Sequence, residues 1–186
     1  MKFIGKFLAA ALLVACLRPA FADYANDRAE IENISNKYMV AVDAGDIETV
    51  MGTWADNGVL IWIFGTERGK DAIRKAMSNF GGARYEAIPE GATSRQRMRH
   101  QIINHVIDVD GDHATTTAYW FAMSNRNPDN ETKLVFFGHY EDKLERIDGH
   151  WKFLERKVYN EGRDNKLLWY PELGEIDPRT RKPPPK

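Results

Sequence analysis

The sequence predicts an α+β fold in which helices precede a sheet built mostly from the second half of the chain. Three observations predict it. Apolar residues between positions 26 and 46 recur at helical spacing, the second half contains four long strand-type runs, and Asp-Gly pairs separate those runs. Because helices and strands are segregated along the chain, we expect the helices to cover one face of a curved sheet.

Three helices are expected before the strand-rich half. Asn26 or Asp27 can cap the first helix, which ends at Gly45. Its apolar stripe consists of Ile31, Ile34, Tyr38 and Val42. Asp46 can cap a short second helix over residues 47–55, and a third is expected over residues 69–80.

Five segments are rich enough in β-branched and aromatic residues, or alternate regularly enough, to predict strands. They are residues 58–64, 95–109, 113–123, 133–146 and 150–158. Asp110-Gly111 and Asp148-Gly149 lie between consecutive segments, and an Asp-Gly pair between apolar runs predicts a β-hairpin. The last four segments therefore predict an antiparallel meander.

Length and charge limit the classes of function. With 186 residues the chain is long enough for one ordinary domain. Its formal net charge of -1 provides no basic field, so we expect no nucleic acid partner. The five histidines show no metal-ligand spacing, and we expect neither a metal nor a cofactor.

The first 22 residues have the pattern of a secretory signal peptide. Lys2 and Lys6 precede an apolar run over residues 7–17, which is too short to span a bilayer, and Ala20-Phe21-Ala22 provides a cleavage site. We therefore expect a periplasmic or secreted protein without stable membrane insertion after cleavage. Lipoprotein processing at Cys16, the only cysteine, is the alternative interpretation.

Three regions follow from this pattern. Residues 1–22 are expected to be the signal peptide and residues 23–165 a single domain. Residues 166–186 are expected to form a partly disordered tail, because this stretch is rich in proline and has little that could pack.

One strand face mixes apolar residues with chemically active ones. Residues two apart in a strand share a face, so His100 and Asn104 should lie beside Met98, Ile102 and Val106. Apolar walls with a few fixed polar groups are typical of a ligand cavity. This pattern makes His100 a candidate general base.

Asp43 is the candidate partner of His100. It lies at the C-terminal end of the first helix, where a carboxylate is electrostatically unfavourable and gains from a hydrogen-bonding neighbour. If the helix packs on the sheet, Asp43 can fix one ring nitrogen of His100 and leave the other to act as a base. The alternative is a structural histidine and an ordinary solvated aspartate.

The chain also resembles the SnoaL-like branch of the nuclear-transport-factor-2-like superfamily. The resemblance extends from Asp27 to Val158. The residues that carry it are Tyr38, Asp43, Gly45-Asp46, Arg99-His100, Asn104, Asp110-Gly111-Asp112, Gly138, Tyr140, Asp142, Leu144, Asp148-Gly149 and Trp151.

The resemblance implies a cone-shaped barrel of a strongly curved, mostly antiparallel sheet wrapped around N-terminal helices. Within the superfamily the chain resembles scytalone dehydratase and hexachlorocyclohexane dehydrochlorinase, which use an Asp–His pair without a cofactor. Asp43 and His100 match that pair, and Arg156 matches a cavity-lining arginine of the dehydrochlorinase. Tyr38 stands where the dehydrochlorinase has lysine, which favours dehydration or isomerisation over loss of halide.

The leading functional hypothesis is a cofactor-independent lyase that acts on a small, largely apolar or aromatic molecule. Asp43 and His100 are the expected catalytic residues, and Tyr38, Asn104, Tyr140, Arg156 and Asn160 are the expected substrate-binding residues. An isomerase could use the same proton abstraction, and a non-catalytic binding or dimerisation module could use the same fold. The superfamily resemblance also implies a homodimer.

Overall fold

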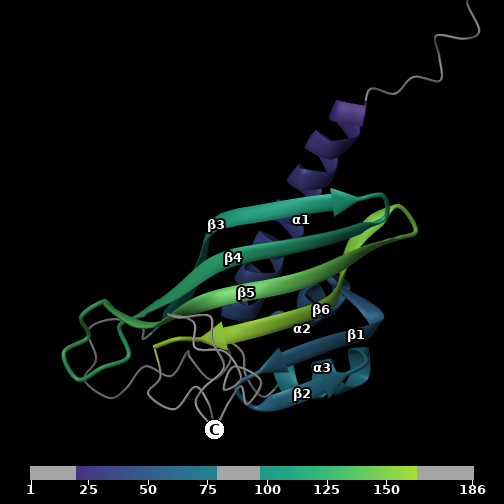
Figure 1. Cartoon of the computed structure of the whole chain (residues 1–186). Helices are drawn as coiled ribbons and strands as arrows, with labels where there is room; N and C mark the ends of the chain where they lie inside the picture. Colours follow the sequence, from purple (N-terminus) through teal and green to yellow (C-terminus); the bar gives the residue numbers. More distant parts are fainter. Residues whose placement is uncertain (1–19, 79–96, 163–186) are drawn as a thin grey trace, which may run out of the picture.

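The computed structural model describes residues 20–78 and 97–162, which form three helices and six strands (Figure 1). The helices are α1 (Ala20–Ala44), α2 (Ile47–Gly52) and α3 (Lys70–Ser78). The strands are β1 (Trp54–Trp62), β2 (Gly65–Arg68), β3 (Met98–Asp110), β4 (His113–Ser124), β5 (Lys133–Ile147) and β6 (His150–Asn160).

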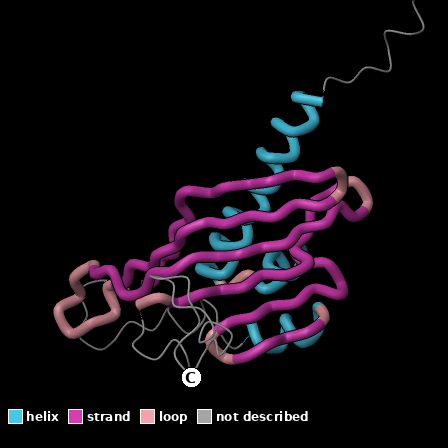
Figure 2. Tube along the Cα trace, in the orientation of Figure 1, coloured by secondary structure: helices cyan, strands magenta, loops and turns pink. Residues whose placement is uncertain are grey.

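The strands form one mixed sheet in the order β2-β1-β6-β5-β4-β3, with the helices on one face (Figure 2). Only β1 and β6 pair in parallel, and the last four strands form the predicted antiparallel meander. The α+β class is therefore confirmed. The predicted cone-shaped barrel needs correction, because the sheet neither closes nor curls strongly, and β2 and β3 are its two edges.

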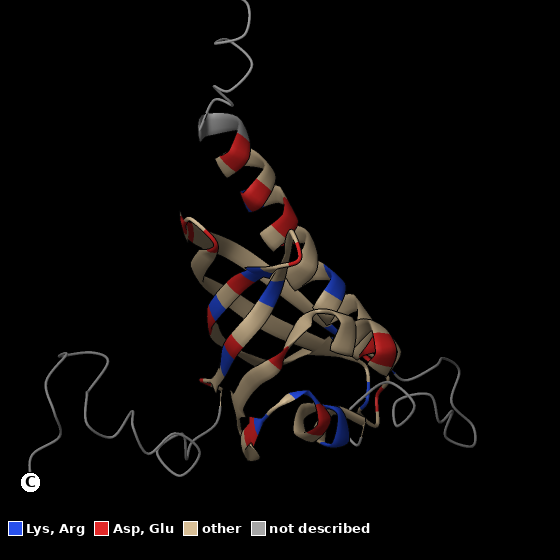
Figure 3. Ribbon diagram, turned by 90° about the vertical axis from the view of Figure 1, so that its right-hand side faces the viewer, with Lys and Arg blue, Asp and Glu red and all other residues tan. Residues whose placement is uncertain are grey.

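The first helix begins earlier than the capping signal predicts. It is already helical at Ala20, and its N-terminal half projects beyond the sheet and carries several acidic residues (Figure 3). Asp27 lies inside the helix and accepts hydrogen bonds from Arg146 (2.8 Å) and from the Trp151 indole (3.2 Å). The side chain that suggested a cap is therefore used for tertiary contacts with β5 and β6.

Several turn and cap predictions are confirmed. Asp46 caps α2 and accepts a hydrogen bond of 3.0 Å from the Thr49 amide. Asp148 and Gly149 connect β5 to β6 with φ values of 51° and 80°, as expected for a two-residue hairpin turn of this composition. β2 is not predicted from the sequence, because its four residues are mostly polar and exposed.

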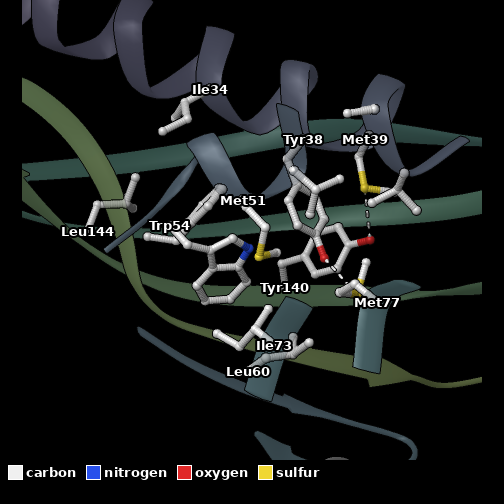
Figure 4. Packing of buried hydrophobic residues seen from close by; sticks show 14 of the residues in the cluster. Ile34, Tyr38, Met39, Met51, Trp54, Leu60, Ile73, Met77, Tyr140 and Leu144 are labelled. Carbon is white, nitrogen blue, oxygen red and sulfur yellow. Dashed lines mark hydrogen bonds between the residues drawn. The ribbon is translucent and has the colours of Figure 1, made fainter. Parts of the chain in front are cut away.

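The core lies between α1 and the inner face of the sheet. The predicted stripe of Ile31, Ile34, Tyr38 and Val42 is buried. Figure 4 shows how this helix packs over Trp54, Met51 and Leu144 from the other elements. This packing fixes the C-terminal end of α1 close to the beginning of β3, where the candidate catalytic residues lie.

A bulge interrupts β3 at Asn104. The cross-strand partners change from Ile103–Tyr119 to Val106–Thr117, so β3 contains one extra residue, and Asn104 has a φ of 53°. The extra residue reverses the alternation. Asn104 and Val106 are exposed, whereas Ile107 is buried, so the prediction that Asn104 and Val106 share the inner face with His100 is wrong.

A buried ion pair crosses from β6 to β5. Arg156 donates two hydrogen bonds of 2.8 Å to Asp142, and both side chains are 1% exposed. Burial alone would lower the pKa of the guanidinium, but the Asp142 carboxylate outweighs this effect and raises that pKa. Arg156 is therefore a permanent positive charge inside the fold.

The ends of the chain lie outside the described residues. Most of the expected signal peptide and all of the expected tail fall there, so both stay predictions. Within residues 20–78 and 97–162, the search for a helix long and apolar enough to cross a bilayer found none.

Gly138 provides a test of the packing between β5 and β6. A Cβ at this position would overlap the carbonyl oxygen of Tyr159, which accepts a hydrogen bond from the Trp120 indole. We expect Gly138→Ala to lower the free energy of unfolding by about 1–3 kcal/mol in urea denaturation. The control is Gly52→Ala, where a Cβ meets nothing within 4 Å and a change within about 0.5 kcal/mol is expected. Equal stability of the two variants would contradict this packing.

The buried ion pair gives a second stability prediction. Asp142→Asn leaves the Arg156 charge without its counter-ion and should lower the free energy of unfolding by about 3–5 kcal/mol. The double variant Asp142→Leu/Arg156→Met removes both charges and should cost less. Urea denaturation of both proteins tests the ordering, and a double variant less stable than the single one would reverse it.

Candidate active site

Asp43 and His100 are in direct contact. The Asp43 carboxylate accepts one hydrogen bond from His100 Nδ1 (2.6 Å) and another from the His100 backbone amide (2.8 Å). Their side chains are only 9% and 11% exposed. The helix therefore fixes both the backbone and the ring of the strand residue.

The contact determines which ring nitrogen is available for chemistry. A carboxylate only accepts hydrogen bonds, so the neutral His100 ring carries its proton on Nδ1. The lone pair is then on Nε2, the nitrogen on the other side of the ring. Since His100 lines a cavity, Nε2 is the atom that can take a proton from a bound molecule.

The cavity has a volume of about 330 Å³ and lies between α1, α3 and the inner face of the sheet. Its walls are mainly apolar and aromatic. They comprise Tyr38, Met39, Val42, Trp62, Ile63, Phe64, Met77, Met98, His100, Trp120, Arg126, Phe136, Tyr140, Val158 and Asn160. An apolar hollow with a few polar groups is the usual form of a small-molecule site.

Rings from three adjacent strands form one wall of the cavity. The ring centroids of His100 and Trp120 are 6.0 Å apart. Trp120 stacks on Tyr140, with centroids 5.8 Å apart and planes at 23°. The base therefore lies at one end of an aromatic surface that suits a flat, apolar ligand.

Tyr38 and Tyr140 are buried and line the same cavity. Figure 4 shows their hydroxyls directed at sulfur atoms: Tyr38 donates to Met77 (4.0 Å) and Tyr140 to Met39 (3.5 Å). A thioether is a weak acceptor, so a ligand oxygen can displace it at little cost. Burial raises the pKa of both phenols, although nearby Arg156 acts in the opposite direction.

Arg156 lies behind the two tyrosines. Its guanidinium carbon is 4.5 Å from the ring centroids of both Tyr38 and Tyr140, and its polar contacts go to Asp142. It does not line the cavity, in contrast to the expectation that it binds substrate directly. The sequence offers no sign that Asp142, on the neighbouring strand, neutralises it.

The two expected asparagines differ in position. Asn160, at the end of β6, is buried and lines the cavity. Asn104 is exposed at the β3 bulge and lies outside the cavity lining, because the bulge turns it away. The structure therefore brings Tyr38, Asp43, His100, Tyr140 and Asn160 together, places Arg156 behind them and excludes Asn104.

Several cavity residues were missed by the sequence reasoning. Met39 and Met77 provide the acceptors for the tyrosines, and Arg126 reaches the cavity from the segment between β4 and β5. Trp62 and Phe64 come from the end of β1 and the turn after it. One available signal was the uninterrupted apolar run Trp62-Ile63-Phe64, which departs from strand alternation.

A second histidine–carboxylate pair lies on the opposite face of the sheet. His139 Nδ1 contacts Glu161, and the ring stacks on Tyr159 with centroids 4.2 Å apart. Neither His139 nor Glu161 borders the cavity. In the part of the chain that the structure describes, no three His, Cys, Asp or Glu side chains group as metal ligands.

Comparison with protein-family models gives a match to the SnoaL-like domain over residues 23–157. A search of curated proteins found no match. Solved structures with a similar fold include two proteins of unknown function. Three others illustrate the similarity.

A candidate scytalone dehydratase from Novosphingobium aromaticivorans is 18% identical, with a TM-score of 0.60 and coverage of 74% of this chain and 85% of that one. A hexachlorocyclohexane dehydrochlorinase (LinA) is 19% identical, with a TM-score of 0.62 and coverage of 76% and 90%. An NTF2-like protein with a cystatin-like fold, also from N. aromaticivorans, is 20% identical, with a TM-score of 0.62 and coverage of 81% and 92%. With the family match covering most of its length, the chain belongs to the SnoaL-like domain family and has the NTF2-like fold.

Proposed function

We propose that the protein is a cofactor-independent lyase that removes water, or a related leaving group, from a small apolar or aromatic molecule. One observation carries the proposal: the Asp43 carboxylate holds His100 Nδ1 at 2.6 Å, and the same ring lines an apolar cavity. Two structures of the same fold bear the names of a dehydratase and a dehydrochlorinase, which is consistent with this class of reaction.

The size of the cavity limits the substrate. A cavity of about 150 Å³ accommodates one benzene molecule. The cavity here has about 330 Å³, so a molecule of one or two fused rings fits it. Because Trp120 and Tyr140 present stacked aromatic surfaces, a flat ring is the best match to the wall beside His100.

In the proposed reaction, His100 Nε2 takes a proton from a carbon next to an activating group such as a carbonyl. The electron pair of that C–H bond forms the new C=C bond as the C–O bond to the leaving hydroxyl breaks. The proton held on His100 then passes to the departing oxygen, so that water leaves and the base is regenerated. Asp43 stabilises the imidazolium formed between these two transfers.

The tyrosines supply donors for oxygen atoms of the substrate. Their raised pKa values keep both phenols protonated, and exchange of a thioether for a carbonyl or hydroxyl oxygen gives each phenol a stronger acceptor. The guanidinium of Arg156 lies 4.5 Å from both ring centroids, and because Asp142 is its counter-ion, its effect on the ligand is that of an ion pair behind the phenols.

Two alternatives remain distinct from the lyase. An isomerase would use the same proton abstraction and return the proton to another carbon, so its product has the mass of its substrate. A binding module would retain affinity for its ligand but would not need the Asp43–His100 contact. Product mass separates the first alternative from elimination, and the variants below separate the second.

Variants of His100 and Asp43 test the proposal. We expect His100→Ala and Asp43→Asn each to lower turnover of a panel of aromatic and alicyclic β-hydroxy ketones by about 10²-fold or more, the usual contribution of a positioned base. His139→Ala is the matched control, because it removes a carboxylate-paired histidine outside the cavity. Substrates are found by mass spectrometry, and deuterium uptake at the activated carbon in D₂O reports proton abstraction directly.

The pattern across these variants decides between the functions. For the lyase, ligand affinity measured by calorimetry should stay within a few-fold in Asp43→Asn while turnover and deuterium uptake fall together. Turnover that survives both cavity variants would exclude the proposed base. A ligand bound equally by all variants, with no exchange in any of them, would favour the binding module.

The raised phenol pKa values predict a specific loss of stability in alkaline solution. In the unfolded chain a tyrosine ionises near pH 10, whereas Tyr38 and Tyr140 stay protonated in the fold. Their contribution is therefore complete below about pH 10 and is lost as the pH rises toward the folded-state values. In urea denaturation, wild type should lose more stability between about pH 9 and 11 than Tyr38→Phe/Tyr140→Phe. Parallel pH profiles would contradict protonated, buried phenols.

A further inference from the structure

The sheet face turned away from the helices carries an apolar patch, here called the outer patch. Its members come from three adjacent strands and are joined by the strand register. The outer patch consists of Ile103, Tyr119, Phe121, Met123, Leu134 and Phe137. Tyr119 is 56% exposed and Leu134 61%, which is unusual for large side chains on one contiguous surface.

The described chain ends against this patch. After β6, the amides of Glu161 and Gly162 both donate to the carbonyl oxygen of Phe137 (2.9 and 3.3 Å). Glu161 contacts His139 on the same face, and a Cβ on Gly162 would be 3.4 Å from the Phe137 ring. Gly162, the last described residue, therefore lies at the edge of the outer patch and on the same side of the sheet.

The segment that starts there contains one apolar run. Residues 167–170 are Leu-Leu-Trp-Tyr, and nearly all the rest of residues 163–186 is charged, polar or proline. Five residues of extended chain reach about 17 Å from Gly162, and the patch is only two strand spacings, about 10 Å, wide. The run itself carries no charge, so it suits an apolar surface better than a charged one.

We propose that residues 167–170 bind the outer patch of their own chain. A tethered segment is present at an effective concentration near the millimolar range, which a second copy reaches only in very concentrated solution. Packing of two leucines and two aromatic rings removes the exposed apolar surface from water. The homodimer implied by the family resemblance stays a prediction, and a second copy is the rival occupant of this face.

Disulfide trapping tests the proposal in the full-length chain. In a Cys16→Ser background, which removes the only native cysteine, Lys166→Cys is combined with Thr117→Cys on the exposed outer face of β4. The control combines Lys166→Cys with Val40→Cys, which is 70% exposed on α1 across the sheet. We expect the Thr117 pair to form an intrachain disulfide at least about ten-fold faster than the Val40 pair.

Non-reducing electrophoresis and mass spectrometry distinguish the outcomes. Adding Leu167→Ser/Trp169→Ser should reduce trapping with Thr117 to the rate of the control, while circular dichroism reports that the fold is retained. Equal rates for the two pairs would overturn the proposal. Disulfides formed mainly between chains would assign the outer patch to a second copy and overturn it as well. The outcome is independent of the proposed catalytic function.

Discussion

The carboxylate of Asp43 joins the first helix to the sheet, and the geometry of the cavity depends on this junction. A carboxylate at a helix C-terminus experiences an unfavourable helix dipole. Two donors from His100, the ring Nδ1 and the backbone amide, offset this penalty and lie at 2.6 and 2.8 Å. The same two bonds orient the imidazole and fix β3 against α1. Asp43 therefore both holds the helix to the sheet and sets which ring nitrogen of His100 faces the cavity.

The polar groups around the cavity are arranged in layers. Nearest the ligand space are a histidine and two phenols, and behind the phenols lies the Arg156–Asp142 pair, which is withdrawn from water. The guanidinium of this pair lies over both phenol rings, and solvent screens a buried pair much less than an exposed one. The apolar walls suit a hydrocarbon frame, and burial keeps the two phenols protonated.

The sequence was informative where a local pattern determines position. Helical spacing identified the buried face of α1, and strand alternation placed His100 on the inner face, because both rules depend only on near neighbours. The Asp148-Gly149 turn followed from its composition. The same two local rules place Asp43 and His100 on facing surfaces of the helix and the sheet, although 57 positions separate them in the sequence.

Long-range packing accounts for the differences. No local pattern in the sequence predicts the bulge at Asn104. Because of this bulge, the side chains that follow it point to the opposite face of the sheet from the one predicted. Arg156 was expected to reach the ligand because it matches a cavity-lining arginine of the dehydrochlorinase. Its partner Asp142 lies on another strand, and nothing local in the sequence pairs the two. The cap assigned to Asn26 or Asp27 failed since Asp27 is held by Arg146 and Trp151, both distant in sequence. The family resemblance implied a cone-shaped barrel of a strongly curved sheet, whereas the sheet here neither closes nor curls strongly.

The irregularity in β3 has a consequence for how the protein can change over evolutionary time. Before it, even-numbered residues point inward, and after it the inward positions are odd-numbered, as His100 and Ile107 illustrate. Loss of the one extra residue would restore regular pairing and keep both halves in phase, whereas a strand of the same length without the bulge would turn one half over. A related chain that is one residue shorter between these two positions could therefore present the same inward side chains from an uninterrupted strand.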